Sequence, residues 1–156
     1  MQAKEKMKSL SSSQKKKITK QLNEQFGISK LPYLLLKFGK EKLRAFSGNL
    51  SREELSQLDK DIRIENIGLY IAKEQNQELR LTMDGTQILK NQITKNILEI
   101  DNKQSEQWFK GNDLDIQTEK GFKILKNNNN IIGSGKSTGE RITNFVPKER
   151  RIKSNS

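Results

Sequence analysis

The residues with the most recognisable chemistry lie near the end of the chain, at positions 131–138, which read IIGSGKST. Glycine, lysine and serine in this order would suit a phosphate-binding loop, in which backbone N–H groups and a lysine hold phosphates at the start of a helix. That loop needs glycine at the first of its eight positions, where Asn130 stands. No apolar helical stripe follows Lys136, and Pro147 would interrupt a helix. We therefore predict that the segment does not bind ATP.

The composition removes most catalytic chemistry. The chain has no cysteine and no histidine, which excludes disulfides, thiolate nucleophiles, the usual zinc sites and the commonest general base. Asp113 and Asp115 share a face if their segment is extended. We interpret this pair as part of a solvated strand, with a catalytic or metal-binding role as the alternative. We expect no enzymatic activity, no cofactor and no metal.

The distribution of charge points to a polyanion. The net charge is +11 over 156 residues. Residues 1–20 hold seven lysines against one glutamate, and residues 136–156 hold six lysines or arginines against two glutamates. Two basic ends on a nearly neutral body are typical of a protein that binds nucleic acid. A solubilising fringe is the alternative interpretation.

The hydrophobic content and the lengths of the apolar runs predict a small soluble protein. Hydrophobic residues make up 31% of the chain, enough for one ordinary domain or two small ones with disordered ends. The longest apolar run, at residues 34–36, is far shorter than the ~18 residues of a membrane span. The first ten residues lack the apolar segment of a secretory signal. We predict no membrane association.

Periodicity predicts alternating helices and strands in the first part of the chain. Residues 11–26 carry apolar side chains every four positions, between a serine and Gly27, and predict a helix. Ser51 and Glu54 form a capping box that predicts a second, short helix. Strands are predicted at YLLLKF, KLRAF, IRIENIGLYIA and ELRLTM, the last two joined by a turn at residues 74–77.

Strands predominate in the second part. Helical turns are predicted at DGTQILKNQI and KQSEQWFKG, and strands at NILEI, GFKILKN, NIIGSGK and RITNF. The four asparagines at positions 127–130 predict a hairpin. The fold class is therefore α+β, with a boundary between Lys90 and Asn96. We predict a basic disordered tail at residues 1–10, a small α/β domain at 11–93 and a small β-barrel-like domain at 94–153.

The second part resembles PUA domains, the RNA-binding module named for pseudouridine synthase and archaeosine transglycosylase. The resemblance rests on a strand that leads to a helical turn with QWFKG at residues 107–111, and on the late step GSG at residues 133–135. It implies a C-terminal PUA-like β pseudo-barrel in which GSGK is part of a strand.

The first part extends the resemblance. FSGNLSREEL, NIGLYIAKEQNQELRLTMDGTQIL and KNILEIDNKQSEQWFKGN resemble, in this order, the Nip-seven ribosome-biogenesis factors, in which a small α/β domain precedes the PUA domain. The ending ITNFVPKERRI is similar to the PUA tails of ribosomal RNA cytosine-5 methyltransferases, although no methyltransferase core precedes it in these residues. The resemblance implies a non-catalytic protein that binds precursor ribosomal RNA during ribosome biogenesis and rRNA processing, in the cytoplasm or, in a eukaryote, the nucleolus.

Basic residues of the C-terminal part are the predicted RNA contacts. Pro147 fixes the backbone before three cations, and arginine offers a planar donor fork to phosphate or to a base edge. The predicted RNA-binding residues are Lys136, Arg141, Lys148, Arg150, Arg151 and Lys153. Lysines 15–17 add non-specific attraction or form a solvated face.

Aromatic residues and glycines of the same part are assigned to structure. Of the adjacent Trp108 and Phe109, one is predicted to fill the barrel core and the other to lie at the domain junction, and Phe145 is predicted in the core, with base stacking as the alternative for Trp108 and Phe109. Gly133 and Gly135 are predicted at a bulge or bend, with close approach of RNA as the alternative.

Two rival functions stay open. The chain could be the RNA-binding subunit of an RNA-modifying enzyme acting in trans, a methyltransferase or a pseudouridine synthase. It could also be a protein-interaction adaptor. The predicted partners are RNA, above all an rRNA precursor, together with ribosome-assembly or RNA-modification proteins.

Overall fold

The computed structural model describes residues 7–47, 53–54 and 68–153. Its elements are helices and antiparallel or mixed sheets, so the predicted α+β class is confirmed. The chain divides into two compact units between Arg80 and Leu81. Of the predicted helix that begins at Ser51, the structure describes only residues 53–54, which are helical. Part of the strand predicted at residues 62–72 lies outside the described residues.

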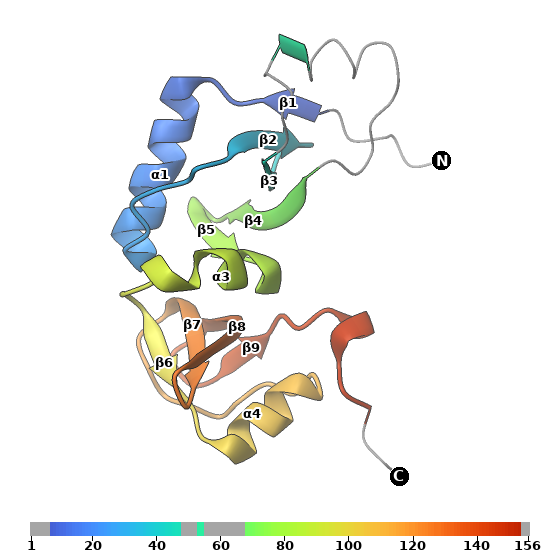
Figure 1. Cartoon of the computed structure of the whole chain (residues 1–156). Helices are drawn as coiled ribbons and strands as arrows, with labels where there is room; N and C mark the ends of the chain where they lie inside the picture. Colours follow the sequence, from blue (N-terminus) through green and yellow to red (C-terminus); the bar gives the residue numbers. More distant parts are fainter. Residues whose placement is uncertain (1–6, 48–52, 55–67, 154–156) are drawn as a thin grey trace. The chain divides into compact units, whose positions relative to one another are not determined.

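The N-terminal unit is built on a five-stranded sheet in the order β1-β2-β3-β4-β5 (Figure 1). Neighbouring strands run antiparallel from β1 to β4. A two-residue turn joins β4 to β5, and both turn residues, Asn76 and Gln77, have positive φ. The strands are β1 (Met7–Ser9), β2 (Leu34–Phe38), β3 (Lys42–Phe46), β4 (Leu69–Gln75) and β5 (Glu78–Leu81).

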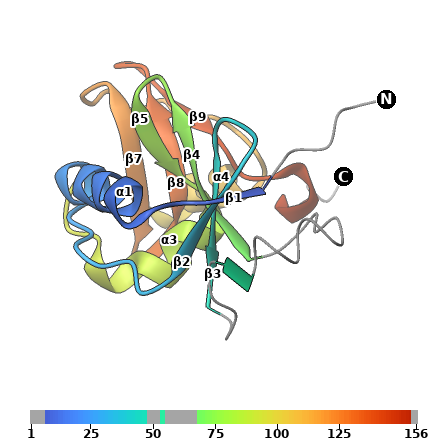
Figure 2. The same ribbon diagram turned by 90° about the horizontal axis from the view of Figure 1, so that it is seen from above.

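Helix α1 (Ser12–Phe26) packs beside this sheet (Figure 2). Its N-terminus is closed by a capping box between Ser11 and Gln14, and its C-terminus by Gly27 with φ of 83°. The apolar stripe predicted from the sequence is buried. The side chain of Gln25 exchanges two hydrogen bonds with the backbone of Leu79, at 2.9 and 3.1 Å, which ties the helix to β5.

Strand β1 corrects one prediction. Residues 7–10 were expected in a disordered basic tail, but Met7–Ser9 pair with residues 36–38 of β2. The reason is apolar burial: Met7 packs against the cluster of Leu36 and Phe38, and Leu10 is buried. Residues 1–6 lie outside the described part of the chain.

The C-terminal unit has a four-stranded sheet in the order β6-β7-β8-β9, in which β6 and β7 are parallel. An isolated bridge joins Leu114 to Ile142 of β9. The elements are α3 (Met83–Leu89), η1 (Lys90–Gln92), β6 (Ile97–Glu99), α4 (Asn102–Phe109), β7 (Gly121–Asn127), β8 (Asn130–Ser137), β9 (Ile142–Asn144) and η2 (Lys148–Arg150).

The division between the units falls ahead of the predicted boundary because α3 packs on the C-terminal sheet. Gln87 Nε2 donates to the carbonyl of Ile131 at 2.6 Å. The hydroxyl of Ser134 donates to the carbonyl of Leu81. These bonds join the segment before residue 94 to β8.

No helix in the described residues is long and apolar enough to cross a membrane.

Candidate nucleic-acid interface

The core of the C-terminal unit explains the second glycine of GSGK. Gly133 and Gly135 lie in β8, so the segment forms a strand, as predicted. A Cβ on Gly135 would lie 2.6 Å from Ile142 Cγ2 and 2.7 Å from Trp108 Cη2. Trp108 is fully buried, as predicted. Gly135 therefore leaves the space that the indole ring fills, which favours the structural interpretation over close approach of RNA.

Asn144 holds the strand end against α4, a role that periodicity could not indicate. Its Nδ2 donates to the carbonyls of Trp108 and Asn112, at 2.7 and 2.9 Å. Its Oδ1 accepts from the backbone N–H of Val146 at 2.8 Å. Val146 is buried, so the chain after β9 is anchored to the unit before the basic tail begins.

The basic tail is docked on this anchor. Its one turn of 3₁₀ helix, η2, follows Pro147, whose carbonyl accepts from the N–H of Arg150 at 2.9 Å. The N–H of Ile152 donates to the carbonyl of Phe109 at 2.7 Å. The tail cations therefore project from ordered backbone, and Lys148 and Lys153 are exposed.

Arg151 has a structural role within the tail. Its Nε donates to the carbonyl of Val146 at 3.1 Å. Its side chain lies against Gly111, where φ is +95° and an added Cβ would meet Arg151 Cδ at 2.6 Å. Arg151 is half-buried. The guanidinium braces the tail, which leaves Lys148, Arg150 and Lys153 as its outward cations.

Arg150 pairs with a carboxylate of α3. Its Nη1 and Nη2 lie 2.9 and 3.2 Å from the two oxygens of Asp84. The hydrogen bond and the charge of Asp84 raise the pKa of Arg150 above its ordinary value, so this side chain stays cationic throughout the physiological range. An exposed ion pair contributes about 0–1 kcal/mol. Displacement of Asp84 from Arg150 by a phosphate therefore costs at most about 1 kcal/mol.

Lys136 and Arg141 have different surroundings. Lys136 Nζ lies 5.5 Å from the centre of the Phe122 ring. The centres of the Phe122 and Phe145 rings are 6.4 Å apart. Phe145 is half-buried rather than in the deep core. Arg141 lies 3.5 Å from Asp115 and 4.0 Å from Asp113. The acidic pair thus balances an arginine.

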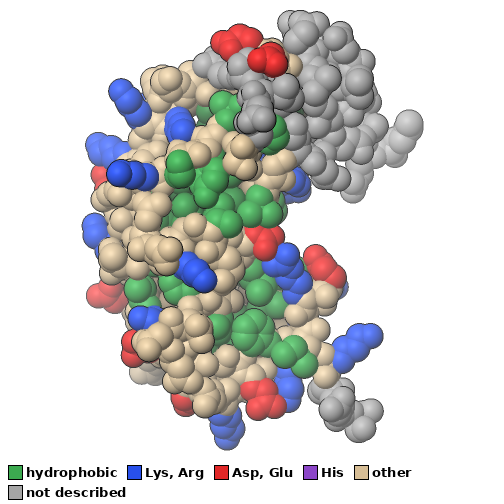
Figure 3. Space-filling view, in the orientation of Figure 1, with side chains coloured by type: hydrophobic (Ala, Val, Ile, Leu, Met, Phe, Trp, Pro, Cys, Tyr) green, Lys and Arg blue, Asp and Glu red, His purple; other side chains and the backbone are tan. Residues whose placement is uncertain are grey.

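Asp113 has a second structural contact. Its Oδ1 accepts from the backbone N–H of Asn144 at 2.8 Å. No group of three acidic, histidine or cysteine side chains in the described residues could hold a metal ion. At the right of Figure 3, around η2, Lys and Arg side chains reach the surface with Asp and Glu side chains among them.

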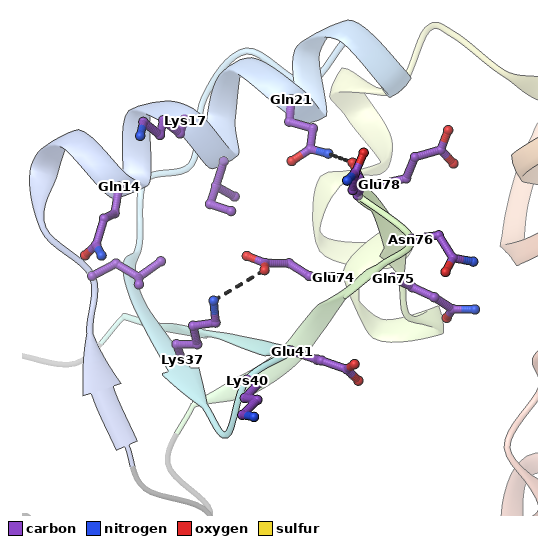
Figure 4. Close-up of a pocket in the computed structure, with 13 residues that line it drawn as sticks. Gln14, Lys17, Gln21, Lys37, Lys40, Glu41, Glu74, Gln75, Asn76 and Glu78 are labelled. Atoms are coloured by element: carbon purple, nitrogen blue, oxygen red, sulfur yellow. Dashed lines mark hydrogen bonds and ion pairs between the residues drawn. The ribbon is translucent and has the colours of Figure 1, made fainter.

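The N-terminal unit offers a different kind of site. A cavity of about 660 Å³, the N-terminal cavity, lies between α1 and the ends of β2 and β4 (Figure 4). Inside it, Lys37 and Glu74 point toward each other and form an ion pair at 3.3 Å. Its charged lining residues are Lys17, Lys37, Lys40, Glu41, Glu74 and Glu78. Equal numbers of lysines and glutamates make it unsuited to a polyanion.

Comparison with known proteins defines the class of the C-terminal unit. Residues 95–152 match the family model described as the Methyltransferase RsmF PUA domain. The match supports the predicted PUA-domain, RNA-binding region. The broader resemblance to Nip-seven factors stays a prediction.

The chain is also similar to individual curated proteins. The chain is 29% identical over 99 residues to Ribosomal RNA small subunit methyltransferase F of Vibrio cholerae serotype O1 (strain M66-2), covering 62% of this chain and 21% of that protein. It is 28% identical over 104 residues to the enzyme of the same name from Psychromonas ingrahamii, covering 62% and 22%. The chain spans about a fifth of the length of these relatives.

Proposed function

We propose that the protein binds ribosomal RNA through its C-terminal unit and does not itself catalyse a reaction. The observation that carries the proposal is the PUA domain at residues 95–152. The names of the relatives point to ribosomal RNA as the ligand. Lys148 and Lys153, exposed on a docked segment, supply phosphate contacts.

The proposal of a non-catalytic role rests on the residues of the chain. It has no histidine or cysteine to serve as base or nucleophile. The acidic pair at Asp113 and Asp115 is bound by Arg141. The protein therefore contributes affinity and orientation toward RNA, in ribosome biogenesis and rRNA processing.

A second candidate follows from the relatives. Their matching segment is a fifth of a methyltransferase, so this chain would serve an RNA-modifying enzyme in trans by holding its substrate. The protein-interaction adaptor is a weaker alternative, because it leaves the PUA domain without a role.

Crosslinking to RNA in cells, followed by sequencing of the attached RNA, tests the proposal. Reads concentrated on ribosomal RNA or its precursors are expected. Reads scattered over unrelated transcripts would contradict the ribosomal assignment. Co-purification of a methyltransferase or pseudouridine synthase with the chain would favour the in-trans candidate over action alone.

A further inference from the structure

A second cavity lies wholly in the C-terminal unit, away from the basic tail in the sequence. It has a volume of about 430 Å³ and lies among α3, η1, β6 and the β7–β8 turn. We call it the amide pocket. Its polar lining residues are Gln87, Lys90, Asn91, Lys126, Asn129 and Asn130. No Asp or Glu is among its lining residues.

The two lysines of the amide pocket carry uncompensated charge. Neither Lys90 nor Lys126 forms an ion pair with a carboxylate in the part of the chain that the structure describes. Lys90 belongs to η1 and Lys126 to β7, so two separate elements place cations around one cavity. Such an arrangement attracts an anionic ligand.

The four asparagines of the β7–β8 turn divide into two pairs. Asn127 and Asn128 both donate to Asn102 Oδ1, at 3.1 and 2.9 Å, and Asn127 also donates to the carbonyl of Ile100 at 3.0 Å. These bonds fix the turn against the start of α4. Asn129 and Asn130 line the pocket, and neither side chain makes a hydrogen bond to another described residue.

From this arrangement we infer that the amide pocket binds one unpaired nucleotide of the bound RNA. Side-chain amides carry a donor and an acceptor and can read the edge of a base. The lysines contact the flanking phosphates. Ile93 and Ile97, which also line the pocket, supply apolar contact to the base. The volume lies in the usual range for ligand pockets, about 300–1,000 Å³.

The inference deepens the proposed function and rests on it. No aromatic side chain lines the pocket, so strong base stacking is not available there. The pocket therefore sets base preference, while the phosphate contacts of the tail supply most of the affinity. An acidic peptide would also match the lysines, and the titration with nucleotides and a polyglutamate peptide distinguishes the two ligands.

Two matched double variants of the full chain test the lysines. Lys90→Gln with Lys126→Gln removes the pocket charges, and Lys103→Gln with Lys120→Gln removes two exposed charges elsewhere in the unit. Binding of a short unstructured RNA is measured from 50 to 200 mM salt. The pocket variant should lower the slope of log affinity against log salt by about 1.4. Between 50 and 200 mM salt, the affinity of this variant should therefore fall about sevenfold less than the affinity of the parent. The control should change the slope far less.

Equal slopes for the two double variants, with RNA bound by the parent, would overturn this inference and leave the proposed function standing. If the parent binds no RNA at all, the inference about the pocket and the proposed function are both contradicted. Circular dichroism of each variant must match the parent.

Nuclear magnetic resonance of the full chain identifies the ligand. Titration with AMP, GMP, CMP and UMP should shift the side-chain amide signals of Asn129 and Asn130, with one base giving the largest shifts, whereas inorganic phosphate should move them less. Shifts produced by a polyglutamate peptide and not by nucleotides would overturn the inference and assign the pocket to acidic peptides. Absence of any shift at these amides on nucleotide addition would also overturn it.

Discussion

The N-terminal cavity and the amide pocket differ in the net charge of their lining residues. The N-terminal cavity has three lysines among three glutamates, with Lys37 held by Glu74. The amide pocket has two lysines, four side-chain amides and no carboxylate in its lining. A polyanion entering the first would meet as many negative as positive groups. In the second it would meet cations, neutral hydrogen-bonding groups and isoleucines, but no carboxylate.

We expect the local arrangement of charges, rather than the net charge of each unit, to decide where RNA binds. Residues 1–80 contain 17 lysines and arginines against 10 aspartates and glutamates, whereas residues 81–156 contain 13 against 9. The N-terminal part therefore has the larger net positive charge. The N-terminal cavity between α1 and the ends of β2 and β4 is nevertheless balanced, although another cavity of this unit is lined by Lys15, Lys16 and Lys20 against Glu24. The docked tail with its outward cations belongs to the other unit.

The largest expected effect comes from matched triple variants in the two units. Replacement of Lys148, Arg150 and Lys153 by Gln should lower the salt slope of RNA binding by about 2, because each phosphate contact to a single strand contributes about 0.7. Replacement of the exposed Lys16, Lys17 and Lys20 of α1 should lower it by less than 1. Filter binding at several salt concentrations measures both slopes. A larger drop for the α1 variant would reverse the comparison.

Arg151 is left intact in that experiment because it braces the tail. The spectrum of each variant by circular dichroism serves as the folding control.

The next prediction distinguishes a structural role of Gly135 from a role in contacting RNA. Gly135→Ala should destabilise the protein by about 1–3 kcal/mol, because the new Cβ overlaps Ile142 and Trp108. Urea unfolding measures the loss. RNA affinity of the folded variant should stay within about twofold of the parent. Unchanged stability with strongly weakened RNA binding would assign Gly135 to the RNA surface.

A smaller effect concerns the carboxylate beside Arg150. Asp84→Asn should tighten RNA binding by up to about fivefold, because it frees the guanidinium and removes a charge that repels phosphate, a change of at most about 1 kcal/mol. Glu119→Gln removes an exposed carboxylate elsewhere in the same unit and provides the control. Fluorescence anisotropy at low salt resolves the difference. Weaker binding by Asp84→Asn would mean that the ion pair positions the tail for RNA.

The smallest expected effect is that of removing one carboxylate from the N-terminal cavity. Glu74→Gln frees Lys37 and should raise RNA affinity by no more than about twofold, because the cavity still holds Glu41 and Glu78. Anisotropy with the same RNA measures it. A gain of tenfold or more would show that this cavity is a latent polyanion site and would weaken the comparison.

Local patterns in the sequence predicted the local structure. Helix α1 carries its apolar stripe between a capping serine and Gly27, and the four asparagines form the β7–β8 turn, where Asn128 and Asn129 adopt positive φ. These features depend on neighbours within a few residues. The sequence also predicted that one of the adjacent Trp108 and Phe109 fills the barrel core, and the structure shows that it is Trp108.

The missed features depend on residues far apart in the chain. Strand β1 has only three residues, and it pairs with residues of β2 that lie 27 to 31 positions away in the sequence. Asp84 and Arg150 are 66 residues apart. The six predicted RNA-binding cations looked equivalent in the sequence, but Arg151 packs against Gly111 and Arg141 meets two carboxylates. Such distinctions require the tertiary structure.

Crosslinking of the full chain to a short ribosomal RNA fragment, with the attached peptides identified by mass spectrometry, tests the central claim most directly. The account predicts crosslinks in the C-terminal unit, on the tail around η2 and at the β7–β8 turn beside the amide pocket. Crosslinks confined to α1 and the five-stranded sheet would contradict it, because they would place the RNA on the N-terminal unit, away from the tail and the amide pocket.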